Sequence, residues 1–212
     1  MRWKIFKKQI ASVEFNDETK FILGIDIGTK STKVAIWNVN RKQAELIDMS
    51  GGYGNPSIPT VMQYIPENRE WVFGEYALLN KGYFEDITIH NILSRLGTKE
   101  LIDISGKPMN IPSLLSRYIK EVIEMCKNIN PNGEVVGVVA AVPDYFSESA
   151  REELVRAFSM AGLDKALITL MSYRECILRY LNFEAPLNEE DKILFINYGG
   201  QQIRGGLIQV NL

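Results

Sequence analysis

VVGVVAAVPDYFSESAREELVRAFSMAGLDKALITLMSYRECILRYL, residues 135–181, alternates strand and helix patterns and decides the fold. Its opening apolar run is typical of an interior strand covered on both faces, and Pro143 ends that strand. Ser149 with Glu152 predicts a capping box at the start of the next helix, and Gly162 predicts its end. ALITLM then predicts a short strand and SYRECILRYL a further helix. This alternation predicts an α/β domain built in layers.

The segments on either side extend the same domain. Upstream, FILGIDIGTKSTKVAIWN at residues 21–38 predicts a hairpin, and a third strand is expected at residues 44–49. A strand pair is expected across PTVMQYI and EWVFGEYA, and Ser113 opens a long helix that NINPNGE ends. Downstream, DKILFINYGGQQIRGGLIQVNL predicts a second hairpin. The complete order predicts a mixed sheet with flanking helices.

Composition places the chain among ordinary globular proteins and excludes several function classes. Of its 212 residues, 46% are hydrophobic and 24% are charged, which suits a buried core beneath a polar surface. The net charge of −2 gives no general attraction to nucleic acid, so no nucleic-acid partner is expected. Cys126, Cys176 and the single histidine, His90, cannot supply a metal cluster or a disulfide framework. A cytoplasmic location is therefore expected, because thiols stay reduced there.

Residues 1–20 form a basic amphipathic leader. MRWKIFKKQI mixes cationic and large apolar residues, but it lacks the continuous apolar core and the cleavage site of a secretory signal. No apolar run in the chain approaches the roughly 20 residues that span a bilayer. Such a leader could contact an anionic membrane or a partner's groove. A frayed or loosely packed leader is the simpler interpretation, because chain termini are often poorly ordered.

The turn DIGTKSTK at residues 26–33 is a candidate phosphate site. It joins two strands, so it is neither a Walker loop nor a dinucleotide fingerprint. A glycine lets the backbone approach a ligand closely, while hydroxyls and a lysine add donors and positive charge. The aspartate, which ends a buried strand, could hold a water of a hydrated magnesium ion. The candidate binding residues are Asp26, Gly28, Thr29, Lys30 and Ser31, with Asp26 as the candidate metal contact. The alternative is a plain tight hairpin turn.

The late segment FINYGGQQIRGG repeats this scheme. An apolar strand is followed by a polar residue, paired glycines, amide donors and a second apolar strand. Two glycine-turn hairpins of one design would suit clamping a phosphate chain from two sides. The candidate residues of the second turn are Gly199, Gly200, Gln201 and Gln202.

Four collinear segments resemble the hexokinase–actin–heat-shock-chaperone superfamily. GIDIGTKSTKVAI is similar to its first phosphate loop, and ILFINYGGQQIRGGLIQV falls where the second belongs. PSIPTVMQY with WVFGEYA, and the whole of residues 135–181, look like segments of the seventy-kilodalton heat-shock chaperones. The resemblance covers residues 21–212. It implies an actin-like, ribonuclease H-like lobe, the first lobe of a chaperone-type nucleotide-binding domain. The implied core is residues 21–50 and 134–212, with an inserted subdomain at about residues 51–133.

The same resemblance implies ATP or ADP with Mg²⁺ as ligand, yet most of the family's hydrolytic residues are replaced here. Only Asp26 matches. The substituted positions are Leu93 or Ser94 for a lysine, Ser172 for a glutamate, Asn197 for an aspartate and Arg204 for a second aspartate. A positioned general base contributes about 10²–10⁴ in rate, and none remains in the second loop. We expect ATPase ancestry without activity in this chain. Binding of ATP is expected to be weak or absent, because one open lobe leaves the purine unburied.

Three functions stay open. The favoured one is a heat-shock-chaperone-like nucleotide-binding lobe, a catalytically degenerate fragment whose partner is a second lobe or another protein. A non-enzymatic actin-like scaffold that binds a partner peptide is the first alternative. A carbohydrate-kinase lobe is the second, because GIDIGTKSTK also looks like the opening of those enzymes, although VPDYFSESAR argues against it.

Several further residues are predicted to pack rather than to bind. Tyr145 and Phe146 are expected beneath the following helix, and Tyr198 is expected to face the core of its hairpin. Cys126 and Cys176 lie on apolar helix faces, which predicts small core residues.

Overall fold

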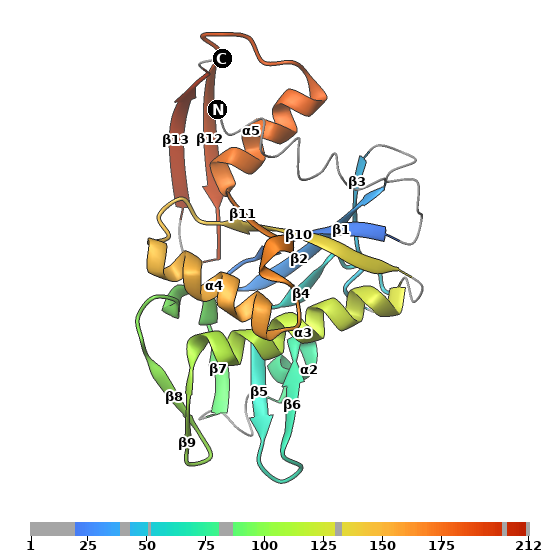
Figure 1. The fold of residues 1–212 in the computed structure, drawn as a ribbon, viewed down its shortest axis with the longest axis vertical. Coiled ribbons are helices and arrows are strands. Elements are labelled where there is room, and N and C mark those ends of the chain that lie inside the picture. Colours follow the sequence, from blue (N-terminus) through green and yellow to red (C-terminus); the bar gives the residue numbers. More distant parts are fainter. Residues whose placement is uncertain are drawn as a thin grey trace.

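The structure is a computed structural model that describes residues 20–38, 43–50, 52–80, 87–129, 133–200 and 203–210. The leader, apart from Lys20, and the candidate residues Gln201 and Gln202 lie outside these ranges. Figure 1 shows a central mixed sheet with helices on both faces, a hairpin at one end and small sheets at the other. The class is therefore mixed α/β, with flanking helices, as the sequence predicts.

The central sheet is the frame of the molecule. Its six strands are β1 (Lys20–Ile27), β2 (Ser31–Asn38), β3 (Gln43–Leu46), β4 (Ser57–Pro59), β10 (Glu134–Val142) and β11 (Ile168–Ser172). The strand order is β11-β10-β1-β2-β3, and β4 also pairs with β2. β1, β10 and β11 are parallel, whereas β2 runs antiparallel to β1. The apolar run at residues 135–142 is thus an interior strand, as predicted.

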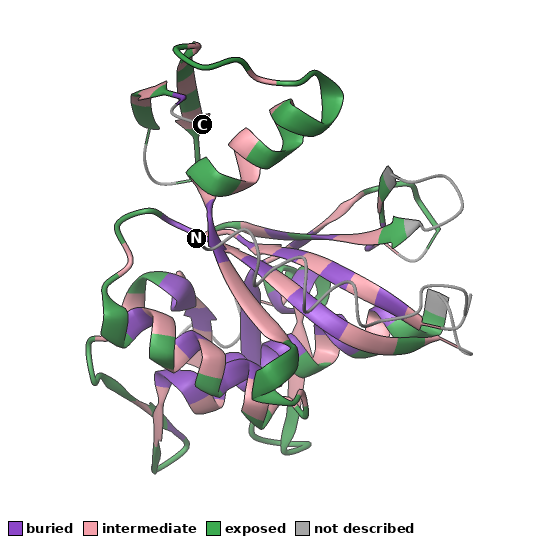
Figure 2. Cartoon of the chain, turned by 45° about the horizontal axis from the view of Figure 1, so that its top comes forward, coloured by how far each residue is buried: buried purple, intermediate pink, exposed green. Residues whose placement is uncertain are grey.

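One face of this sheet carries most of the core. Burial alternates along β1, so its odd-numbered residues are buried and its even-numbered residues are half-buried. α3 (Ile111–Ile129) and α4 (Glu148–Met160) lie below the sheet in Figure 1, and α5 (Tyr173–Glu184) lies above it. Figure 2 shows the buried residues concentrated in the sheet and the two lower helices, while α5 is largely exposed. The apolar surface that stabilises the fold is therefore mainly on the side of α3 and α4.

The elements between β4 and α3 in the sequence form the end of the molecule below α3 in Figure 1. They are β5 (Val61–Ile65), β6 (Glu70–Phe73), α2 (Gly74–Leu79), β7 (Thr88–His90), the 3₁₀ helix η2 (Ile92–Arg95), β8 (Leu101–Ile104) and β9 (Lys107–Asn110). The predicted strand pair exists as β5 and β6, but the residues GEYA begin a helix instead. Gly74 has a φ of +58°, and a Cβ there would lie 2.5 Å from Ile58 Cγ1, so only glycine fits where strand becomes helix.

A buried hydroxyl cluster joins α3 to the central sheet. The Tyr118 hydroxyl of α3 lies 2.9 Å from Thr32 Oγ1 and 3.2 Å from the carbonyl oxygen of Pro59. Thr32 Oγ1 in turn lies 3.0 Å from Thr60 Oγ1. Burial raises the pKa of Tyr118 to about 12, because a phenolate there would lose its hydration. The cluster therefore ties α3 to the first hairpin through neutral hydroxyls.

The helix caps differ from the sequence-based expectation. The capping box predicted at Ser149 and Glu152 is wrong, because α4 begins two residues earlier with Ser147 as N-cap, whose side chain accepts from the Ala150 amide. A complete capping box occurs instead at the start of α5, between Ser172 and Glu175. Each cap pairs an amide that the helix itself leaves unsatisfied.

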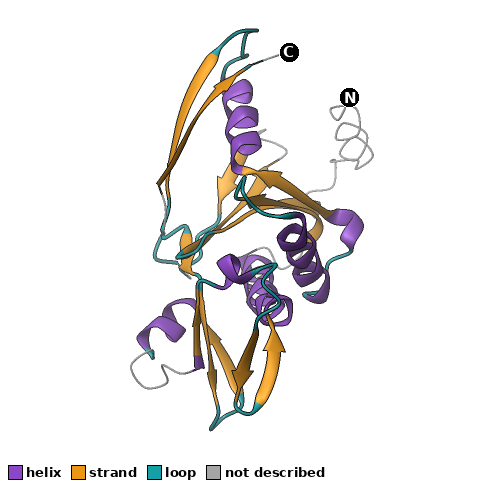
Figure 3. Ribbon diagram, turned by 90° about the vertical axis from the view of Figure 1, so that its left-hand side faces the viewer, coloured by secondary structure: helices purple, strands orange, loops and turns teal. Residues whose placement is uncertain are grey.

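The second hairpin stands apart from the central sheet. β12 (Lys192–Tyr198) and β13 (Ile203–Gln209) pair only with each other among the described strands, and they form a two-stranded sheet beside α5 (Figure 3). Tyr198 is 81% exposed, so its predicted place in the core is wrong. Tyr145 is likewise exposed, whereas Phe146 is partly buried and packs against the core as predicted.

None of the helices in the described ranges is both long enough and apolar enough to cross a membrane.

Candidate functional site

The candidate site lies where the parallel strands end. β1, β10 and β11 finish at Ile27, Val142 and Ser172, and their register places Asp26 beside Ala141. Because parallel strands present their carboxyl ends at one edge, the segments that follow all emerge there. These segments are the first glycine turn, the loop before α4 and the first turn of α5.

The first glycine turn is held closed by its own backbone. The Gly28 amide donates to the carbonyl oxygen of Ser31 over 3.0 Å, and a Cβ at Gly28 would lie 2.6 Å from that oxygen. Glycine is required here by the close approach of the carbonyl, not by an unusual φ. The carbonyl of Lys30 accepts from the Thr60 amide, which fixes the other side of the turn. Further donors for an anion must come from Thr29, Lys30 and Ser31, because the Gly28 amide is already engaged.

The second glycine turn meets the first. A Cβ at Gly200 would lie 2.7 Å from Lys30 Cγ, so the lysine stem packs directly on the glycine backbone. The two turns, far apart in the sequence, therefore converge, and Lys30 lies between them. Gly199 is exposed beside this contact, while Gln201 and Gln202 fall outside the described residues.

Asp26 is engaged by a residue to which the sequence reasoning gave no role. The Tyr173 hydroxyl, at the first position of α5, donates to Asp26 Oδ1 over 3.0 Å. Burial raises the pKa of Asp26, while the Tyr173 hydrogen bond and the charge of Lys33 act against that rise. Burial and the neighbouring Asp26 together raise the pKa of Tyr173, so this hydroxyl stays a donor. The Asp26 carboxylate thus already has a protein partner.

Two cationic side chains contact the loop before α4. The Arg204 guanidinium of β13 lies 3.9 Å from the ring centroid of Tyr145, in the loop before α4, which is a cation–π contact. Arg174 Nε lies 3.4 Å from Asp144 Oδ1 in the same loop. These contacts attach the second hairpin and α5 to the loop at the strand ends. Arg204 thus places a positive charge on Tyr145, at a position where the resemblance implies an aspartate.

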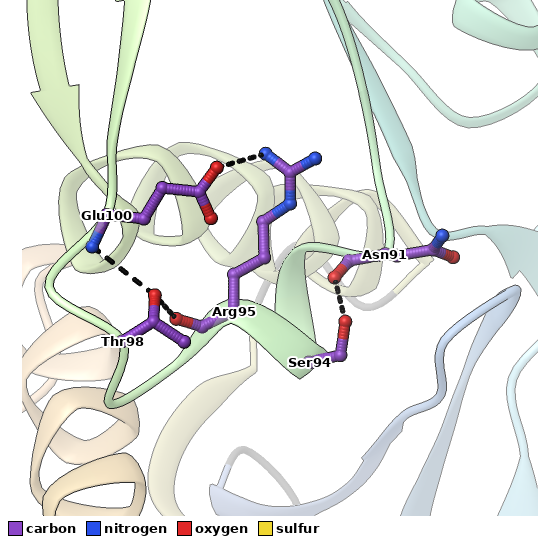
Figure 4. Close-up of polar contacts among 5 residues, drawn as sticks. All are labelled: Asn91, Ser94, Arg95, Thr98 and Glu100. Carbon is purple, nitrogen blue, oxygen red and sulfur yellow. Dashed lines mark hydrogen bonds and ion pairs between the residues drawn. The ribbon is translucent and has the colours of Figure 1, made fainter.

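In the segment where the resemblance places a lysine, the side chains contact residues of the same segment. Leu93 is buried in the core, and the Ser94 hydroxyl donates to the carbonyl oxygen of Asn91 (Figure 4). Arg95 is the cation of this segment, and its Nη1 lies 3.3 Å from Glu100 Oε1. The hydroxyl of Thr98 bridges the Arg95 carbonyl and the Glu100 amide, which closes this small network.

The other substituted positions have structural roles. Ser172, where the resemblance places a glutamate, is the N-cap of α5 and pairs reciprocally with Glu175. Asn197 and Arg204 lie opposite each other in the register of the second hairpin. None of these side chains supplies a carboxylate where the family pattern has one.

The described residues do not form a protein metal site. They contain no group of three or more His, Cys, Asp or Glu side chains placed to hold one ion. Magnesium prefers several oxygen ligands, and Asp26 offers one carboxylate that Tyr173 already contacts. The donor set therefore does not fit a directly bound magnesium ion.

Sequence reasoning missed the contributions of Tyr173, Tyr145 and Cys176. The sequence predicts Tyr173 as part of a helix and Tyr145 as a packing residue, yet both follow the ends of parallel strands. Cys176 is half-buried near Asp26, and burial with that carboxylate raises the pKa of its thiol to about 11. The signal that could have found Tyr173 is its place directly after a short parallel strand, at the edge that the first turn also occupies.

Comparison with known proteins agrees with the earlier resemblance. The chain is 26% identical over 194 residues to the chaperone protein DnaK of Metamycoplasma hominis, covering 90% of this chain and 30% of that relative. It is 30% identical to the DnaK proteins of Ureaplasma parvum serovar 3, over 184 residues, and Mycoplasmopsis pulmonis, over 185 residues. Each of these matches covers 85% of this chain and 28% of the relative. The similarities indicate an ancestry shared with the seventy-kilodalton heat-shock chaperones. The chain spans about three-tenths of the length of these relatives.

Residues 43–212 match the C-terminal part of DUF5716, a family of unknown function. The chain belongs to this family.

Proposed function

We propose that the chain is a heat-shock-chaperone-like lobe that binds the phosphate chain of ATP or ADP weakly and does not hydrolyse it. The observation that carries this proposal is the convergence of the two glycine turns, with Lys30 packed on Gly200. The relatives named as DnaK chaperones support a nucleotide-binding ancestry. The proposed lobe comprises residues 21–212, with residues 51–133 as its inserted subdomain, and a second lobe or a partner protein would cover the purine.

The chemistry of the described site supports the proposed lack of turnover. Attack on a phosphoryl group needs an oriented water and stabilisation of the developing charge. Asp26 is the remaining carboxylate of the family pattern, and its Oδ1 accepts from Tyr173. Lys30 and Lys33 supply positive charge that can attract a phosphate chain. Charge without a positioned base supports binding rather than hydrolysis.

A non-enzymatic scaffold is the second candidate. Two observations favour it: the Tyr173 hydroxyl engages the carboxylate that a nucleotide-bound magnesium ion would need, and the second hairpin exposes apolar side chains. In this interpretation the glycine turns are retained for folding, and a partner peptide is the ligand.

Titration calorimetry with ATP, ADP and adenosine, in the presence of Mg²⁺, distinguishes the nucleotide-binding lobe from the scaffold. Weak binding of ATP and ADP with similar affinity, and none of adenosine, is expected if the phosphate chain is the group recognised. Lys30→Ala should weaken binding several-fold. Lys107→Ala changes an exposed lysine of β9 and should leave the affinity unchanged. Phosphate release should not exceed the buffer blank.

Two results would change the assignment. Phosphate release above the blank that Asp26→Ala abolishes would establish an active ATPase. A complete absence of binding by ATP and ADP at millimolar concentrations would remove the nucleotide proposal and leave the scaffold.

A further inference from the structure

Asp26 is engaged from two directions by groups of this chain. Its Oδ1 accepts from the Tyr173 hydroxyl of α5 over 3.0 Å. Lys33 lies opposite Asp26 in the register of β1 and β2, so both side chains point to the face of the sheet that α5 covers. The charge of Lys33 acts on the Asp26 carboxyl. A hydrated magnesium ion would therefore meet a hydrogen-bond donor and a cation at the carboxylate that it needs.

Two neighbouring carboxylates are engaged as well. Asp144 Oδ1, in the loop before α4, lies 3.4 Å from Arg174 Nε. Glu175 Oε2 accepts from the Ser172 amide over 3.0 Å, within the capping box of α5. Freeing a second oxygen ligand for magnesium would therefore break either an ion pair or a helix cap.

Cationic side chains at the strand ends are placed to meet a phosphate chain instead. Lys30 and Lys33 are exposed, so their ammonium groups can reach a ligand, and the stem of Lys30 packs on Gly200 where the two glycine turns converge. Arg204 holds its guanidinium 3.9 Å from the ring centroid of Tyr145, in the loop that follows β10. Positive charge of this kind attracts a phosphate chain most strongly when that chain carries its full negative charge.

We propose that the site takes its phosphate chain without magnesium, an inference that rests on the proposed function. Magnesium bound to ATP cancels part of the negative charge of the triphosphate, so the two lysines attract the complex less. The bound ion also keeps a shell of waters that need acceptor oxygens, and the Asp26 carboxylate already accepts from Tyr173. The uncomplexed chain avoids both effects. The ligand class is a free nucleoside triphosphate or diphosphate rather than its magnesium complex.

Titration calorimetry with ATP in two buffers of equal ionic strength tests the proposal. One buffer contains an excess of Mg²⁺ and the other contains EDTA, and matching the ionic strength keeps the screening of the lysines constant. The wild type should bind ATP about 5-fold more tightly in EDTA, because the metal-free chain keeps the charges that the lysines attract. Equal or tighter binding in Mg²⁺ would overturn the inference and leave the proposed function standing. An absence of binding in both buffers at millimolar ATP would remove the proposed function itself.

A pair of tyrosine variants tests the part played by the contact with Asp26. Tyr173→Phe removes the donor and should narrow the preference for metal-free ATP to about 2-fold or less, because the freed carboxylate can accept from a water of the magnesium complex. Tyr180→Phe removes the hydroxyl of a 63% exposed tyrosine on the same helix, and this matched control should keep the preference of the wild type.

The ratio of the two affinities is the quantity compared, since a general loss of binding lowers both affinities together and leaves their ratio unchanged. Circular dichroism checks that each variant folds. Should Tyr173→Phe unfold, Lys33→Gln removes the cation opposite Asp26 and should narrow the same preference. An unchanged ratio in the folded variant would contradict the view that these contacts keep magnesium from Asp26.

Discussion

Breaking the contact between Tyr173 and Asp26 should cost stability that depends on pH. Tyr173→Phe removes the hydroxyl that donates to Asp26 Oδ1 over 3.0 Å and leaves the ring in place. A hydrogen bond to a charged group contributes about 1.5–3 kcal/mol. Asp26 is half-buried and water can partly replace the donor, so we expect about 1.5 kcal/mol at neutral pH, near the lower limit of that range. For a domain of this size the melting temperature should fall by about 3–6 °C.

The pH dependence has a definite sign. The folded-state pKa of Asp26 is raised from 3.8, chiefly by burial, so protonation of this carboxyl favours the folded state. The contribution of that protonation to the free energy of unfolding is complete below pH 3.8 and is lost as pH rises through the folded-state pKa. Tyr173→Phe removes a hydrogen bond that lowers this pKa, so the loss should move to higher pH. Asp26→Asn cannot ionise and should flatten the dependence in this range.

A double-mutant cycle in urea isolates the pairwise term. Unfolding free energies of the wild type, Tyr173→Phe, Asp26→Asn and the double variant are compared at neutral and acidic pH. The coupling should exceed about 1 kcal/mol at neutral pH and shrink as Asp26 becomes protonated. A coupling within about 0.3 kcal/mol of zero at both pH values would refute the view that the tyrosine holds this carboxylate.

Three further substitutions test the packing around the site. Tyr118→Phe removes the hydroxyl shared by Thr32 and the Pro59 carbonyl and should cost about 1–3 kcal/mol in urea unfolding; an unchanged midpoint would show that the cluster contributes nothing. Gly97→Ala forces a side chain onto a φ of +81° and should cost about 1–2 kcal/mol, whereas a rise in melting temperature would contradict that strain. Glu153→Gln weakens the 2.6 Å hydrogen bond that the Glu153 carboxylate accepts from the Gly97 amide. The free energy of unfolding in urea should fall by about 1 kcal/mol, and a value equal to that of the wild type would contradict this role.

Much of the fold was predictable because its signals are local. The apolar run at residues 135–142 and the alternation along Phe21–Ile27 specify strands on their own, and Pro143 and Gly162 mark ends. The β8–β9 hairpin escaped prediction because its strands are short and lack clear alternation. Its turn does carry a signal, since Asp103 accepts from the amide of Gly106, whose φ is +80°.

The site was less predictable because its decisive contacts join distant parts of the sequence. Tyr173 lies 147 residues from Asp26, and no local pattern relates them. The exposure of Tyr198 depends on the absence of a third strand beside its hairpin in the described chain, which an apolar pattern alone does not reveal. The expectation of a core tyrosine assumed a covering layer that these residues do not provide.

Amide NMR during titration with tripolyphosphate tests the central claim most directly, because this ligand carries the phosphate chain without the purine. The account predicts that the amides of Thr29, Lys30, Gly199 and Gly200 shift together, with one dissociation constant in the millimolar range. Shifts confined to one turn, or none at either turn at saturating ligand, would contradict a shared phosphate cradle.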